Sequence, residues 1–113
     1  MLHTVSLNEN KDFRRLYKAG KSLVHSVVVI YYSKNKLGVT RVGVTVSKKI
    51  GNAVIRNRVK RIVLEAYRSL EEKIPAGFDL VFVARGRAVP LKSTDLTRSI
   101  SMLLKNAGIM SKE

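Results

Sequence analysis

Residues 44–61 read VTVSKKIGNAVIRNRVKR, and this stretch decides how the middle of the chain folds. Valine occupies every second position from 42 to 46, which is the alternation of a half-buried β-strand. After Gly51 the pattern changes, because Asn52 is a favoured helix N-cap residue and no helix-breaking residue follows it for about twenty positions. The sequence therefore predicts a strand over 41–47 that leads directly into a helix over 53–72.

The predicted helix has two different faces. Its apolar residues recur at intervals of three and four, which is typical of a stripe buried against a core: Val59, Ile62, Val63, Ala66 and Leu70. Its basic residues lie away from that stripe: Arg56, Arg58, Lys60, Arg61 and Arg68. We expect a helix that is buried on one side and cationic on the other.

The flanking sequence predicts the remaining elements. Ser6 and Glu9 have the spacing of a capping box and Gly20 is a natural helix end, so a first helix is expected over 8–19. Further patterns indicate a β-rich segment over 23–32, a polar hairpin loop over 33–38, a buried strand over 78–84 and a last helix over 94–107. This order predicts an α/β fold, with helices packed on a small mixed sheet, in one domain of residues 1–113.

The charge of the chain points to a polyanionic partner. There are 22 Lys and Arg against 8 Asp and Glu, for a formal net charge of +14. No acidic residue occurs from Phe13 to Leu64, although this segment holds more than half of the basic residues. A long acid-free segment favours one basic surface, as binding to many phosphate groups requires.

Several other classes of protein are disfavoured. Cysteine is absent, the two histidines have no metal-ligand or catalytic spacing, and no glycine-rich phosphate loop is present. We therefore expect no enzymatic activity of the protein alone. The longest apolar run, Val27 to Tyr32, is too short to span a bilayer, and the N-terminus lacks a signal-peptide core. A cytoplasmic protein with no membrane contact and no obligate protein partner is expected.

The start of the second helix is the candidate binding site. A helix N-terminus offers free backbone N–H donors and a positive dipole end, both of which suit a phosphate. Lys48 and Lys49 precede this end, and the basic residues of the first turns extend the charge. The alternative interpretation is a cationic helix face that is merely solvated.

Residues 44–61 closely resemble the RNR signature of the ribonuclease P protein family. The resemblance extends over nearly the whole chain and includes residues 10–20, 41–43 and 78–85. It implies an α/β sandwich with three helices and a four-stranded sheet, in the order αβββαβα, and a left-handed β-α-β crossover against the general rule. The fourth strand is expected from a division of residues 23–32 around His25 and Ser26.

The resemblance also implies a function. Members of the family are the non-catalytic protein subunits of ribonuclease P, a ribonucleoprotein endoribonuclease that removes the 5′ leader of precursor tRNA. The RNA subunit carries the hydrolysis with Mg²⁺ that it mainly binds itself, and no organic cofactor is implied. The expected partners are the catalytic RNA and the precursor tRNA leader. No protein ligand of a metal ion can be assigned.

Two sets of site residues follow by position from the resemblance. Residues expected to bind the catalytic RNA are Lys48, Lys49, Asn52, Arg56, Asn57, Arg58, Lys60 and Arg61, with a local structural role as an equal alternative for Asn57. Residues expected to bind the leader by stacking on unpaired bases are Phe13, Tyr17 and Tyr31. Phe13 is equally compatible with a place in the core, and Tyr32 is expected to face the core.

The chain departs from the family pattern at two places. It reaches the first helix after only a few residues, and Leu64 stands where some members have a further basic residue. Two other functions remain open at this point. One is a general RNA-binding or ribosome-associated module, and the other is a DNA-binding protein that uses residues 53–72 as a recognition helix.

Overall fold

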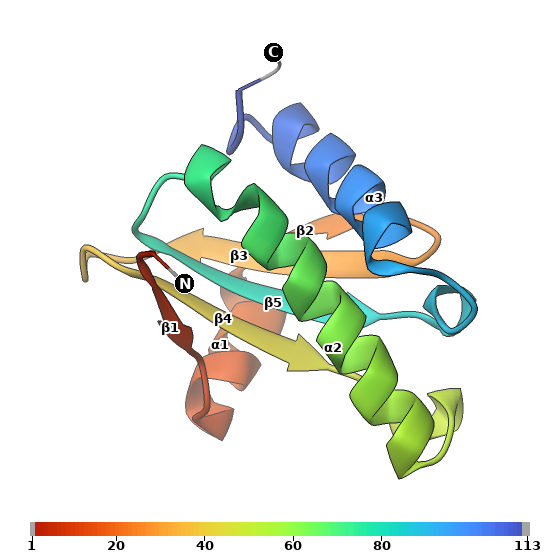
Figure 1. The fold of residues 1–113 in the computed structure, drawn as a ribbon. Helices are drawn as coiled ribbons and strands as arrows, with labels where there is room; N and C mark the ends of the chain where they lie inside the picture. Colours follow the sequence, from red (N-terminus) through yellow and green to blue (C-terminus); the bar gives the residue numbers. More distant parts are fainter. Residues whose placement is uncertain (1, 112–113) are drawn as a thin grey trace.

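The computed structural model describes residues 2–111. The five strands form one sheet in the order β1-β4-β5-β3-β2 (Figure 1). In chain order the elements are β1 (Thr4–Ser6), α1 (Asn10–Ala19), β2 (Lys21–Val24), β3 (Val28–Lys34), β4 (Thr40–Thr45), the 3-10 turn η1 (Lys48–Ile50), α2 (Ala53–Leu70), the 3-10 turn η2 (Glu71–Lys73), β5 (Phe78–Ala84), the 3-10 turn η3 (Gly86–Ala88) and α3 (Ser93–Asn106).

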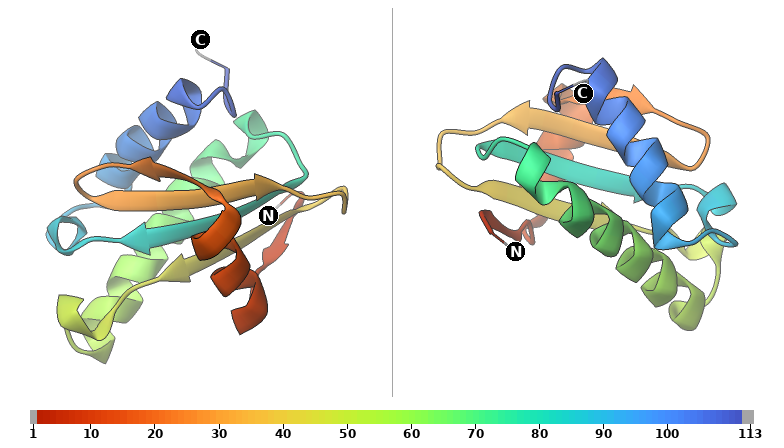
Figure 2. Two further views of the ribbon diagram at one scale, coloured as in Figure 1. Left: turned by 180° about the vertical axis from the view of Figure 1, so that it is seen from behind. Right: turned by 45° about the horizontal axis from the view of Figure 1, so that its top comes forward.

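Helices cover both faces of the sheet. Helices α2 and α3 lie side by side on one face and α1 crosses the other (Figure 2). Successive side chains of β5 point to opposite faces of the sheet and are buried on both. Leu80 and Phe82 belong to the large core with α2 and α3, whereas Val81 packs with Leu7 and Leu16 beneath α1. The nearly continuous apolar run of this strand is thus explained by burial on both faces.

The central strand β5 separates β3 from β4. It pairs antiparallel with β3 and parallel with β4. The prediction of a hairpin loop over 33–38 is therefore wrong, because the strands that this connection joins are not paired with each other. An apolar strand buried on both faces is best accommodated in the centre of a sheet with a neighbour on each side, and β5 takes that place.

The β-α-β crossover from β4 through α2 to β5 has the less common handedness. In Figure 1, α2 lies in front of the sheet, both strands run from left to right, and β5 lies above β4. The crossover is therefore left-handed, as the resemblance implied and against the general preference for right-handed crossovers.

The expectation of four strands is wrong, because β1 adds a fifth. This strand has 3 residues and pairs parallel with β4 at the edge of the sheet. The backbone N–H groups of Leu2 and His3 donate to the buried Glu71 carboxylate at 2.8 and 3.2 Å, and the Thr4 hydroxyl also donates to it. Burial alone would raise the pKa of Glu71, but these hydrogen bonds outweigh it and lower the pKa. Contacts with residues almost seventy positions away, and not a local pattern, fix this strand.

Most other elements agree with the sequence-based expectations to within a few residues. The division of residues 23–32 into β2 and β3 is confirmed, as is the cap of α2, where the Asn52 side chain accepts a hydrogen bond from the Ile55 N–H at 3.0 Å. The prediction of a capping box at the first helix is wrong. Ser6 lies in β1, and Glu9 precedes α1 without a side-chain capping bond. Among the described residues, no helix is long and apolar enough to cross a membrane.

Candidate nucleic-acid interface

The N-terminal end of α2 presents most of the residues expected to bind RNA. Lys48 and Lys49 lie in η1 immediately before the helix, and both are exposed. Four residues at and after the cap of α2 are also exposed: Asn52, Asn57, Lys60 and Arg61. Among the residues that the structure describes, Arg61 makes one long ion pair, with Glu65 at 3.7 Å on the surface of the helix, so most of its guanidinium donors are available to a ligand.

Two of the expected RNA-binding arginines have structural contacts. Arg56 Nε donates to the Gly51 carbonyl oxygen at 3.2 Å, across the turn that starts α2. Arg58 donates through Nη1 to the Val89 carbonyl oxygen at 2.7 Å and through Nη2 to the Leu91 carbonyl oxygen at 2.8 Å. Both side chains are half-buried, and Arg58 fixes the connection between β5 and α3. Their direct contact with RNA stays a prediction.

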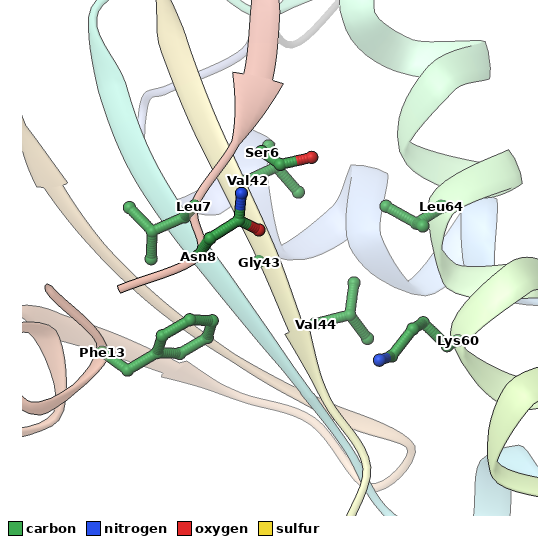
Figure 3. Close-up of a pocket in the computed structure, with 9 residues that line it drawn as sticks. All are labelled: Ser6, Leu7, Asn8, Phe13, Val42, Gly43, Val44, Lys60 and Leu64. Atoms are coloured by element: carbon green, nitrogen blue, oxygen red, sulfur yellow. The ribbon is translucent and has the colours of Figure 1, made fainter. Parts of the chain in front are cut away.

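A hollow lies between α1, β4 and the side of α2. Its volume is about 280 Å³, and Figure 3 shows Lys60 and Leu64 of α2 on one side and Phe13 of α1 on the other. Phe13 also lines a second hollow with Arg14 and Tyr17, and Lys60 and Leu64 also line a third with Arg61 and Arg68. The three hollows share lining residues and are therefore neighbours. Together we call them the groove, which extends from the aromatic residues of α1 past β4 to the basic face of α2.

The aromatic side chains expected to bind the leader form one cluster at the α1 end of this groove, where Phe13 and Tyr17 line the groove and Tyr31 packs beside Tyr17. The ring centroids of Phe13 and Tyr17 are 6.4 Å apart, and those of Tyr17 and Tyr31 are 5.0 Å apart in an edge-to-face arrangement. Tyr17 is 41% exposed, and its hydroxyl is 2.7 Å from Thr45 Oγ1, which fixes the ring at the groove. Tyr32 lies on the opposite face of the sheet in the large core, as expected.

Phe13 both packs and lines the groove. Its ring lies over Gly43 of β4, where an added Cβ would come within 2.5 Å of the ring. It also contacts the small core beneath α1 while remaining half-buried. Glycine at position 43 thus makes room for the Phe13 ring. This structural role of Gly43 cannot be seen in the sequence alone.

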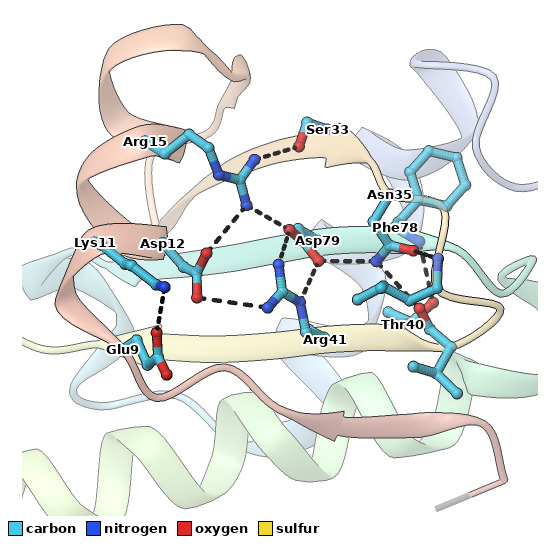
Figure 4. Close-up of polar contacts among 12 residues, drawn as sticks. Glu9, Lys11, Asp12, Arg15, Ser33, Asn35, Thr40, Arg41, Phe78 and Asp79 are labelled. Atoms are coloured by element: carbon cyan, nitrogen blue, oxygen red, sulfur yellow. Dashed lines mark hydrogen bonds and ion pairs between the residues drawn. The ribbon is translucent and has the colours of Figure 1, made fainter.

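An ion network around the buried Asp79 carboxylate holds α1 against the sheet. The Asp79 carboxylate of β5 accepts hydrogen bonds from Arg41 of β4 at 2.9 and 2.7 Å and from Arg15 of α1 at 2.7 Å (Figure 4). Asn35 donates to the same carboxylate at 2.8 Å, and Asp12 of α1 pairs with Arg41 at 3.4 Å. Because Arg15 and Asp12 flank Phe13 on α1, the network also sets the position of the aromatic end of the groove.

Asp79 was not recognised as a site residue in the sequence. The signal was available, because an aspartate inside an apolar central strand must be paired when it is buried. Burial alone would raise the pKa of the Asp79 carboxyl, but the hydrogen bonds from Arg41, Asn35 and Arg15 outweigh it and lower the pKa to about 2. Arg14 and Arg68, which line the groove, were likewise not assigned to it, because only the packing of α1 and α2 brings them there.

The lowered pKa of Asp79 predicts a specific loss of stability in acid. With an ordinary pKa of 3.8 in the unfolded chain and about 2 in the folded one, ionised Asp79 contributes about 2.5 kcal/mol. This contribution is fully present above about pH 4 and is lost as the pH falls towards about 2. Urea unfolding of the wild type and of Asp79→Asn at several pH values should show a stability difference that shrinks over this window. A difference that stays constant from pH 5 to pH 2 would contradict the assignment.

The described side chains do not form a metal site. Among residues 2–111, no group of three or more His, Asp or Glu side chains is placed so that it could hold a metal ion. The groove is lined mainly by cationic, aromatic, apolar and neutral polar residues, and Glu65 is its one acidic residue among those described. Such a set fits a phosphate chain with unpaired bases better than a metal cation.

Comparison with known proteins gives consistent matches over nearly the whole chain. A family model described as Ribonuclease P matches residues 1–108. The ribonuclease P protein component of Clostridioides difficile (strain 630) is 46% identical over 107 residues, which cover 94% of this chain and 94% of that protein. The solved RNase P protein of Staphylococcus aureus has a TM-score of 0.83 at 34% identity, covering 94% of this chain and 97% of that chain. The solved RNase P protein from Thermotoga maritima has a TM-score of 0.81 at 32% identity, with coverage of 90% and 96%.

Proposed function

The chain belongs to the ribonuclease P protein family, and we propose that it assists removal of the tRNA 5′ leader by binding two RNA segments at two adjoining surfaces. It is the protein subunit of a ribonucleoprotein endoribonuclease that acts in tRNA 5′ processing, and it has an RNA partner in that enzyme. A general RNA-binding module without a role in tRNA processing is not favoured, because the matches share one family name and cover most of the chain.

The first surface is η1 with the N-terminal half of α2, and its partner is the catalytic RNA. Four exposed basic residues lie there: Lys48, Lys49, Lys60 and Arg61. Within residues 2–111 their one ion pair is the long contact of Arg61 with Glu65. Arg61 offers a planar group of donors that suits a phosphate, whereas the lysines act as point charges. The Asn52 cap leaves the other N–H groups of the first turn available for the same ligand.

The second surface is the groove, and its ligand is the single-stranded leader of precursor tRNA. The observation that carries this proposal is that two neighbouring hollows, which share Phe13, reach from the aromatic cluster on α1 to Lys60 on α2. Leader bases stack on Tyr17 and Tyr31 whatever their sequence. Lys60 neutralises phosphates of the leader backbone. Such binding suits a protein that must accept many different leaders.

The protein contributes positioning and not bond breaking. We propose that the catalytic RNA, with Mg²⁺ that it mainly binds itself, hydrolyses the phosphodiester bond. The roles of this chain are to neutralise phosphates, hold the leader in the groove and so favour precursor over mature tRNA.

The proposal is tested by cleavage of a precursor tRNA at low Mg²⁺, with bacterial ribonuclease P RNA in the presence and absence of this protein. We expect cleavage at the mature 5′ end to be much faster with the protein, and we expect no cleavage by the protein alone. Tight RNA binding without any stimulation would contradict the proposal and favour a general RNA-binding module.

A substitution at Tyr17 tests the leader groove. Tyr17→Ala should weaken binding of precursor tRNA to the holoenzyme by about 5- to 150-fold, because one stacked base contributes about 1–3 kcal/mol. Mature tRNA, which lacks the leader, should bind as before. Tyr17→Phe is the matched control, since it keeps the stacking ring and removes only the contact with Thr45. Equal losses for precursor and mature tRNA would refute the groove as the leader site.

A further inference from the structure

The connection between β5 and α3, residues 85–92, is a second basic surface. Arg85 and Arg87 are both exposed. Within the described residues neither forms an ion pair, and the acidic residue that follows them in the sequence, Asp95, is bound to Arg98 at 2.6 Å and to the Lys92 N–H at 2.9 Å. The two arginines therefore carry uncompensated charge that the proposed function has not used.

This connection is held by internal hydrogen bonds and by one buried residue, although it contains no long regular element. Ala88 at its centre is fully buried in the large core, and its N–H donates to the Arg85 carbonyl oxygen at 2.9 Å. The Leu91 N–H in turn donates to the Ala88 carbonyl oxygen at 3.1 Å. A basic loop that is already fixed loses little conformational entropy when it binds a ligand.

Arg58 joins this loop to the candidate RNA-binding helix. Its guanidinium extends from the second turn of α2 and donates to the Val89 and Leu91 carbonyl oxygens at 2.7 and 2.8 Å. Both views of Figure 2 and the view of Figure 1 place the loop at the same end of the molecule as η1 and the start of α2. Arg85 and Arg87 thus lie at the end of the protein where Lys48 and Lys49 are exposed.

We infer that residues 85–92 extend the surface that binds the catalytic RNA, with Arg85 and Arg87 contacting its phosphates and Arg58 acting as a positioning residue that holds the loop in place. The inference rests on the proposed function of η1 and α2. The location of the loop at the same end of the molecule as that surface, and the lack of an ion pair at Arg85 and Arg87 among residues 2–111, favour a polyanion. The half-buried state of Val89 and Leu91 leaves no large apolar patch on the loop for a protein partner.

The test measures binding of bacterial ribonuclease P RNA to three double variants over a range of salt concentrations. Arg85→Ala with Arg87→Ala tests the loop, and Lys48→Ala with Lys49→Ala tests the surface of the proposed function. Lys34→Ala with Lys73→Ala is the charge-matched control, because both lysines are exposed and lie at the other end of β3 and α2. Circular dichroism confirms that each variant is folded.

We expect the loop variant to bind about tenfold more weakly at near-physiological salt. The slope of log K against log salt should fall by about 0.7–0.9 for each phosphate that the variant no longer neutralises. An affinity no weaker than that of the control would overturn the inference. If the Lys48 and Lys49 variant still binds more weakly in that case, the proposed function stands without the loop. If it also binds like the control, the proposed function fails together with the inference.

The substitution Arg58→Lys distinguishes a positioning role of Arg58 from a direct phosphate contact. It is made in two backgrounds, the wild type and the Arg85 and Arg87 double variant. Lysine keeps the charge, but it lacks the planar group that reaches two carbonyl oxygens at once. A positioning role predicts a several-fold loss of affinity in the wild type that disappears in the double variant. It also predicts faster tryptic cleavage after Arg87. Retained affinity and unchanged cleavage in Arg58→Lys would refute the positioning role.

Discussion

Replacement of Asp79 by Ala is expected to lower the free energy of unfolding by about 3 kcal/mol, because removal of one partner from a buried ion pair leaves the other charges uncompensated. The Asp79 side chain is 1% exposed, whereas Arg41 and Arg15 are 25% and 45% exposed. Solvent can therefore reach the released arginines, which keeps the destabilisation at the lower end of the range for buried pairs. Urea unfolding near neutral pH measures it.

The same substitution should also affect the groove. Asp79 binds Arg15 of α1 and Arg41 of β4, so its removal takes away one of the contacts that hold the helix with Phe13 and Tyr17 against the sheet. Glu65→Ala is the control, because Glu65 makes only an exposed contact with Arg61 on α2, and about 0.5 kcal/mol or less is expected from it. If both variants unfold at the same urea concentration as the wild type, the network does not stabilise the fold in the way proposed.

Simultaneous replacement of Lys48, Lys49, Lys60 and Arg61 by Ala should weaken binding of the catalytic RNA by a factor on the order of 10² to 10³ at near-physiological salt. The estimate follows from four phosphate contacts, each of which contributes about 0.7–0.9 to the slope of log K against log salt. All four side chains are exposed, so the fold should be preserved. Filter binding at several salt concentrations measures both the affinity and the slope.

A second fourfold variant separates a local surface from the effect of total charge. It removes the exposed Lys21, Lys34, Lys36 and Lys73, which lie at the opposite end of the sheet and of α2. Its net charge equals that of the first variant, and only a small decrease in affinity is expected. Comparable decreases in the two variants would mean that RNA binds through the diffuse charge of the protein, and η1 with α2 would lose its assigned role.

The elements that the sequence predicted well are those whose signals are local. The start of α2 depends on Asn52 and its bond to the Ile55 N–H three residues later, and the apolar run of β5 is contained in the strand itself. The strand β1 was missed because its stability depends on β4 and on Glu71 far along the chain. The expected hairpin between β3 and β4 failed for the same reason, since a later strand lies between them.

The site was predictable as a set of residues but not as a geometry. The basic end of α2 and the aromatic residues of α1 could be named from motif resemblance and residue chemistry. That Phe13 lies over Gly43, that Arg58 binds the Val89 carbonyl oxygen, and that Asp79 joins α1 to the sheet are consequences of tertiary packing. Arg58 has the same chemistry as the exposed Arg61, and only its place on the α3 side of α2 gives it a different partner.

The central position of β5 delays formation of the sheet during synthesis. Until residue 84 has left the ribosome, β3 and β4 lack their shared neighbour, and a pair such as Val28 with Ala84 joins residues more than 50 positions apart. Domains with such distant pairings fold more slowly than helical bundles, because the cost of closing the long intervening loops comes before the contacts form. A nascent or truncated chain that ends before β5 would present two separate strand edges, each able to pair with another chain, so such fragments should aggregate rather than retain half of the groove.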